Sequence, residues 1–111
     1  MNIDADTIAR IDATLLPQLD RHHLRLLAHC LSSFRDMSSD VDGALPDAAQ
    51  RRQWCEQQPV VADDPQFLRI LLDQLNNAAQ QLEDVAKHCR KVPLELSLDD
   101  LIAAAERRCR S

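Results

Sequence analysis

A carboxylate and a histidine three residues apart are the feature of this 111-residue chain that comes nearest to a metal site. Asp20 and His23 both fall on the apolar arc of a segment whose periodicity predicts a helix. Metal sites in helical bundles combine such pairs from several helices, and the sequence offers no second inward-facing pair. A metal or small cofactor bound around Asp20 and His23 is therefore an alternative hypothesis. We prefer a simpler interpretation, which needs no cofactor. The positive end of the helix dipole stabilises the Asp20 carboxylate in the first turn, and His23 makes one buried hydrogen bond.

The positions of the four cysteines predict thiols that mostly pack in the core and bind no metal. Cys30, Cys55, Cys89 and Cys109 are separated by 25, 34 and 20 residues, and none of these spacings is a redox or zinc motif. The acidic N-terminus has no secretory signal, so we expect reduced thiols and a cytoplasmic location. Cys30 and Cys89 lie on apolar stripes and are expected to be buried. Cys109 lies among arginines, which could lower its thiol pKa and make it the most reactive thiol, although a cysteine at a frayed helix end is the simpler interpretation, which we prefer.

Two further patterns concern ions. Residues 38–43 have part of the spacing of a calcium loop, but Ser38 and Ala49 stand where acidic ligands are needed, so we expect a turn. The basic clusters 87–91 and 107–110 would form one anion-binding patch if the last helix folded back, although both also suit helix ends. A regulator that contacts nucleic acid through the C-terminal arginines is a further alternative. The net charge of −5 and the lack of interleaved aromatic residues argue against a nucleic-acid partner.

The composition predicts an all-α protein, because the chain has 17 leucines and 14 alanines but one glycine and no tyrosine. We expect a single compact bundle of four to five helices over residues 1–111. Apolar periodicity predicts helices over 3–16, 17–37, 46–57, 64–92 and from 97 onward, with loops at 38–45 and 58–63 and an extended link at 94–96. The segments 17–37 and 64–92 are expected to form the long central antiparallel pair.

Proline and capping residues punctuate this pattern. Asp64 followed by Pro65 predicts the start of one long helix, and Ser97 with Asp100 predicts a capping box at the start of the last helix. Pro17 either breaks or kinks the chain between the first two helices, and the sequence leaves both options open.

Large apolar residues outside the inner stripes predict an interface. Trp54, Phe67, Ile70 and Leu26 lie at or beyond the stripe edges, and an exposed apolar patch marks a site of interaction unless other helices cover it. The sequence holds no nucleophile–base pair or phosphate-binding loop, and its apolar runs are too short to span a membrane. We therefore expect an adaptor or regulatory module without catalytic activity of its own. It would bind a protein partner or another copy of itself. The helical pattern is shared by too many unrelated proteins to name a pathway.

Overall fold

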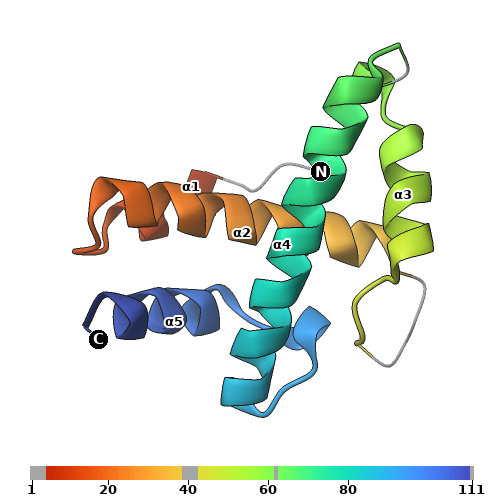
Figure 1. Ribbon diagram of the computed structural model, residues 1–111. Helices are drawn as coiled ribbons and strands as arrows, with labels where there is room; N and C mark the ends of the chain where they lie inside the picture. Colours follow the sequence, from red (N-terminus) through yellow and green to blue (C-terminus); the bar gives the residue numbers. More distant parts are fainter. Residues whose placement is uncertain (1–4, 39–42, 62, 111) are drawn as a thin grey trace.

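The structure is a computed structural model that describes residues 5–38, 43–61 and 63–110. These residues contain five α-helices and two short 3₁₀ helices, and no strand occurs among them. The helices are α1 (Ala5–Asp12), α2 (Gln18–Met37), α3 (Ala48–Glu56), α4 (Pro65–Cys89) and α5 (Leu98–Arg110), with η1 (Pro59–Val61) and η2 (Pro93–Glu95) between them (Figure 1). The predicted all-α bundle is confirmed. No helix in the described part of the chain is both long enough and apolar enough to cross a membrane.

The first two helices are separate. The first was predicted over 3–16, but α1 ends at Asp12 and a turn leads to Pro17. The backbone N–H and the hydroxyl of Thr14 both donate to the Ile11 carbonyl oxygen, at 3.1 and 2.7 Å, and so satisfy an acceptor in the last turn of the helix. Pro17 therefore breaks the chain into two helices instead of kinking one. The turn leaves Leu15 fully exposed.

The predicted capping residues at α4 and α5 are confirmed. The Asp64 carboxylate accepts from the backbone N–H groups of Gln66 and Phe67, each at 3.1 Å. At the other end, α4 stops at Cys89 because Arg90 takes left-handed backbone angles (φ 58°). The Lys91 N–H then donates to the Ala86 carbonyl at 3.0 Å, which closes a Schellman motif without glycine.

The two long helices cross. The sequence predicts them as an antiparallel pair, whereas Figure 1 shows α4 passing steeply over α2. Ala78 and Ala79 are buried in the middle of α4, and small side chains there allow two helix backbones to approach at one crossing point. Beyond the crossing, the N-terminal half of α4 packs on α3, and α5 lies alongside α2.

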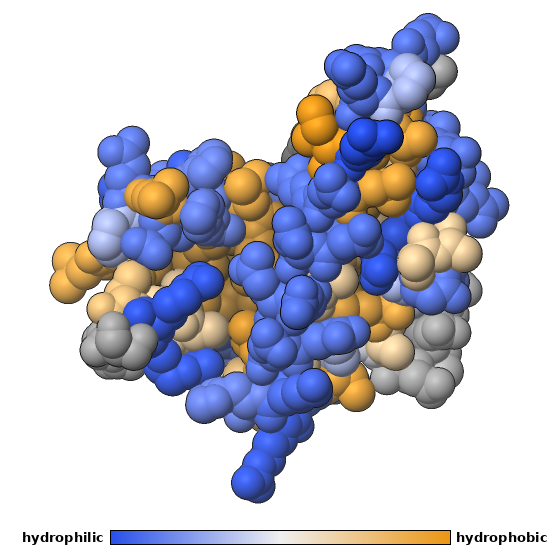
Figure 2. Space-filling view, viewed as in Figure 1, coloured by the Kyte–Doolittle hydropathy of each residue, from blue (hydrophilic) through white to orange (hydrophobic). Residues whose placement is uncertain are grey.

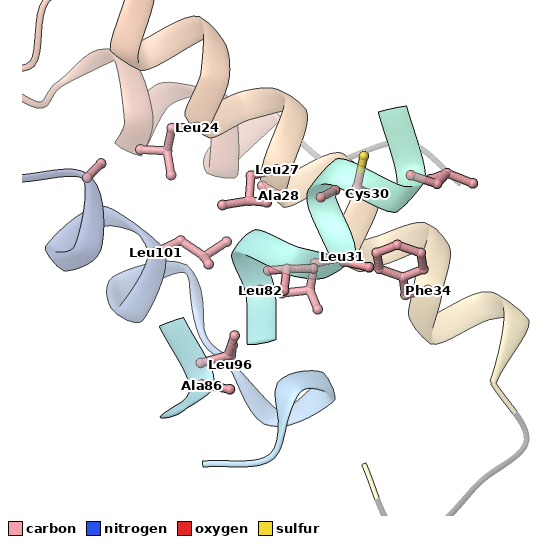
Figure 3. Close-up of a cluster of buried hydrophobic side chains, with 14 of the residues drawn as sticks. Leu24, Leu27, Ala28, Cys30, Leu31, Phe34, Leu82, Ala86, Leu96 and Leu101 are labelled. Atoms are coloured by element: carbon pink, nitrogen blue, oxygen red, sulfur yellow. The ribbon is translucent and has the colours of Figure 1, made fainter. Parts of the chain in front are cut away.

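The core lies where α2, α4 and α5 meet. Figure 3 shows side chains from all three helices pointing toward one another, among them Leu31, Phe34 and Leu82. Phe34 and Leu82 are completely buried. This core fixes the relative positions of the three helices that frame the site described below.

The segment before α5 is held by backbone contacts. We expected an extended link over 94–96, but Pro93–Glu95 form the 3₁₀ helix η2 because Pro93 suits a first helical turn. Arg35 on α2 donates to the carbonyl oxygens of Leu94 and Leu96, at 3.0 and 2.5 Å. The Leu94 N–H donates to the Gly43 carbonyl at 2.9 Å. These bonds hold the segment before α5 against α2 and against Gly43.

Candidate interaction groove

Two adjoining clefts lie between α2, α4 and α5. The first has a volume of about 250 Å³ and the second about 380 Å³. They share four lining residues, which are His23, Leu27, Gln81 and Arg108. Because these residues line both clefts, we treat the two as one surface and call it the groove.

One face of α4 forms the floor of the groove. At 100° per residue, seven side chains from its first turn to its last share this face, and we call them the groove row: Phe67, Ile70, Gln74, Asn77, Gln81, Asp84 and His88. The last five line the two clefts. A second set points away from both groove and core, and we call it the outer face: Arg69, Asp73, Asn76, Gln80, Glu83 and Lys87. The helix therefore has a core face, a groove row and an outer face.

The chemical character of the groove changes along its length. Before the second cleft, the same face of α4 begins with two exposed apolar side chains that line neither cleft, Ile70 (62% exposed) and Phe67 (39% exposed). The middle of the groove carries the amides of Gln74, Asn77 and Gln81. Figure 2 shows polar side chains along α4, and apolar surface over α2 and beside the N-terminal half of α4.

The far end of the groove is basic. Arg107 and Arg108 of α5 line the first cleft together with His23 and His88, and Asp84 is the one carboxylate among its lining residues. The whole chain has the opposite balance, with a net charge of −5. A local surplus of cationic groups on an acidic protein attracts anionic groups to that place.

The comparison with protein families identifies the chain. The family model described as NDH complex assembly factor CRR9 matches residues 3–111. The chain belongs to this family. An assembly-factor family accords with a role in protein interaction, which is the general class of function that the sequence predicts. No match was found among curated proteins or among solved structures.

The structure places the two residues of the hypothetical metal pair in different surroundings in this CRR9-family chain, although they are one turn apart on α2. His23 is exposed in the groove, where the sequence predicts a buried histidine, and Asp20 is half-buried beside Cys109. The expected burial was wrong because α4 crosses α2 and covers only part of its apolar arc. Within the described residues, no group of three or more His, Cys, Asp or Glu side chains is placed to hold a metal ion. Metal binding by Asp20 and His23 stays a prediction, and the described residues add no further ligand to this pair.

All four cysteines are free thiols, and Cys30 and Cys55 are buried. Burial raises the pKa of the Cys30 thiol to about 11. Burial, followed by the charge of Glu56, also raises the pKa of Cys55. The pKa of Cys109 is raised too, by partial desolvation and then by Asp20, against the smaller lowering effect of Arg108. The alternative of a lowered pKa at Cys109 is wrong, because packing α5 on α2 brings a carboxylate to the thiol.

The predicted interface residues differ in exposure. Phe67 and Ile70 are exposed on the groove row, and Leu26 is exposed and lines the second cleft. Trp54 is half-buried and packs against the core from α3, away from the groove. Sequence reasoning missed Leu19, which is 65% exposed although it shares the apolar arc of α2. Its position on the uncovered side of that arc depends on where α4 crosses.

The two basic clusters are not one patch. Lys91 forms an ion pair with Asp100 in the first turn of α5 at 2.7 Å, whereas Arg107 and Arg108 lie near the other end of that helix. His88, from the first cluster, lines the first cleft together with the two arginines. In the hypothetical calcium loop, residues 39–42 lie outside the described residues.

Proposed function

We propose that this protein takes part in the assembly of an NDH complex by binding a protein component of that process in the groove. The observation that carries the proposal is the family match, which runs from residue 3 to residue 111 and so includes every helix that frames the groove. Exposed apolar side chains beside a cleft with polar groups are typical of a surface that binds protein.

The proposal extends the prediction of an adaptor without catalytic activity of its own. An adaptor needs a stable surface, and the groove is framed by three helices around one buried core. We also propose that the protein works in a reducing compartment such as the cytoplasm, a view supported by four free cysteines. Self-association in place of a heterologous partner is an outcome that the tests below distinguish.

Gene deletion tests the proposed function. In the organism that makes this protein, deletion should lower the amount of assembled NDH complex on native gels, and the wild-type gene should restore it. Intact assembly in the deletion strain would refute the proposal.

Two neighbouring asparagines provide a matched pair for the groove. Asn77→Trp places a bulky ring in the groove and should fail to restore assembly. Asn76→Trp places the same ring on the outer face and should restore it. Both side chains are exposed, so both variants should fold, which thermal melting by circular dichroism would check. Equal restoration by both would show that the groove is not the surface used.

A further inference from the structure

The charge and the apolar end of the groove together define a class of partner. We propose that the groove binds an extended acidic segment of a partner protein, with apolar side chains at one end and Asp or Glu side chains at the other. This inference rests on the proposed function, since it names the chemistry of the component that the groove takes.

The basic end determines where the acidic residues lie. Arg107 is half-buried and Arg108 is exposed, and both line the first cleft with two histidines. Guanidinium groups bind carboxylates in paired hydrogen bonds, whatever further contacts Arg108 makes within the chain. Asp84 lies in the same cleft and prevents a purely cationic surface, so the arrangement fits a few spaced carboxylates in preference to a dense polyanion.

The apolar end determines which end of the bound segment carries the apolar side chains. Phe67 and Ile70 begin the groove row, and Leu26 of α2 lines the neighbouring cleft. At 1.5 Å per residue, the row from Phe67 to His88 is about 30 Å long. Apolar partner side chains therefore dock near Phe67 and Ile70, beyond the second cleft, while the carboxylates meet Arg107 in the first cleft and Arg108, which lines both.

The middle of the groove favours an extended chain. Gln74, Asn77 and Gln81 each offer a hydrogen-bond donor and an acceptor. A helix satisfies its own backbone groups, whereas an extended chain presents free N–H and C=O groups that such amides can bind. An extended segment of about nine residues spans the row, at roughly 3.3 Å per residue.

A nucleic acid fits the groove less well. The lining of the two clefts includes no aromatic side chain except the histidines, and bound single strands rely on aromatic stacking. The charged backbone of a nucleic acid would also make no favourable contact with the exposed apolar side chains at the other end. Crosslinking to nucleic acid is accordingly an outcome that would overturn the proposal.

Site-specific photocrosslinking in the producing organism tests the proposal with the full chain. A benzophenone amino acid replaces Gln81, which lines both clefts, and in a control replaces Gln80, which lies on the outer face. We expect a crosslink from position 81 and none from position 80. Mass spectrometry should find the crosslinked peptide within a few residues of an Asp or Glu cluster. A crosslink to a basic or uncharged segment, to nucleic acid, or to a second copy of this chain would overturn the inference.

A charge swap then tests the arginines with a synthetic copy of the crosslinked peptide. The double variant Arg107→Glu/Arg108→Glu should bind the peptide about tenfold more weakly, because two attractions become repulsions. A peptide with Lys in place of its acidic residues should recover binding to the double variant. The control double variant Arg69→Glu/Lys87→Glu makes the same charge change on the outer face and should bind like the wild type.

A single variant keeps the test valid if the double variant does not fold. Arg108→Glu changes an exposed residue alone, and we expect about a threefold loss from it if the double variant unfolds. Unchanged peptide binding by a folded Arg108→Glu variant, or no recovery with the Lys peptide, would overturn the inference.

The inference and the proposed function fail in different ways. If deletion of the gene leaves NDH complex assembly intact while position 81 crosslinks to an acidic segment, the proposed function fails and the groove chemistry stands. If deletion blocks assembly while position 81 crosslinks to a segment without acidic residues, the proposed function stands and the inference fails.

Discussion

At the scale of single residues, the cysteines show how burial decides reactivity. Neighbouring arginines in the sequence indicate a reactive Cys109, but the nearest influences in the structure are desolvation and the Asp20 carboxylate, and both raise its pKa. Sequence neighbours on a helix point in different directions, so a charge from another helix can outweigh them. The burial of Cys30 could be predicted, because its position on the apolar stripe of α2 is a local property.

Thiol labelling follows from these pKa values. At about two units above its usual value of 9.0, the Cys30 thiol has roughly a hundredfold smaller thiolate fraction near pH 8, in addition to being buried. We expect iodoacetamide to modify Cys109 first and to spare Cys30 and Cys55 until the protein unfolds. Peptide mass spectrometry after timed labelling, with and without urea, measures this order. Rapid labelling of Cys30 in the native protein would contradict the packing of α2 against α4.

At the scale of elements, helix starts were predicted well because capping bonds are local. The Asp64 cap and the Ser97–Asp100 box join residues two or three positions apart, so their residue types in sequence suffice. The third helix was placed at Pro46, but it begins at Ala48 because Asp47 and Gln50 form a reciprocal capping box. The helix ends were harder to predict, since Arg90 adopts the left-handed conformation that glycine usually signals.

Asp100 makes the start of α5 sensitive to acid. The hydrogen bond from Lys91, and then that from the Ser97 N–H, lower the pKa of Asp100 below its usual 3.8. A carboxyl with a lowered folded-state pKa stabilises the fold above its unfolded pKa, and this contribution disappears as the pH falls through the folded value. Asp100→Ala should reduce the free energy of unfolding at pH 7 by about 1 kcal/mol, as the loss of a cap does.

Urea unfolding at several pH values measures this effect. The difference between Asp100→Ala and the wild type should narrow as the pH falls below the usual Asp value of 3.8 and through the lowered folded-state pKa, because the wild-type carboxyl then becomes protonated too. Asp99→Ala is the control, because it changes the neighbouring acid in the same turn and leaves the Ser97 box intact, while it removes only an exposed ion pair with Arg10, which contributes little to stability. A difference that stays constant from pH 7 to the acid limit would show that the charge of Asp100 contributes nothing.

At the scale of the whole molecule, the sequence predicts which residues are apolar but not which of them a neighbour covers. The apolar arc of α2 is broader than one crossing can bury, so Leu19 and Leu26 remain exposed while Leu24 and Leu31 are buried. The groove arises from the same geometry, since it needs the angle at which α4 crosses α2 and the placement of α5 beside α2. Both depend on packing between distant segments, so periodicity alone could not predict them.

The exposed apolar end of the groove should be separable from the core by mutation. Phe67→Ser/Ile70→Ser should change the free energy of unfolding by no more than about 1.5 kcal/mol, because both side chains already contact solvent. Leu75→Ala, on the core face of the same helix, should cost about 3 kcal/mol, since its side chain is 2% exposed. Urea unfolding measures both values.

The same variants distinguish an interface from a partly covered core. If Phe67 and Ile70 serve binding, the double variant folds but fails to support NDH complex assembly, whereas a low-expressing Leu75→Ala strain recovers assembly when more protein is supplied. At the wild-type amount of folded protein, Phe67→Ser/Ile70→Ser should still be defective, because its defect lies in affinity and not in the amount of folded protein. Unfolding of the double variant would place these two side chains in the core and remove the apolar end from the groove.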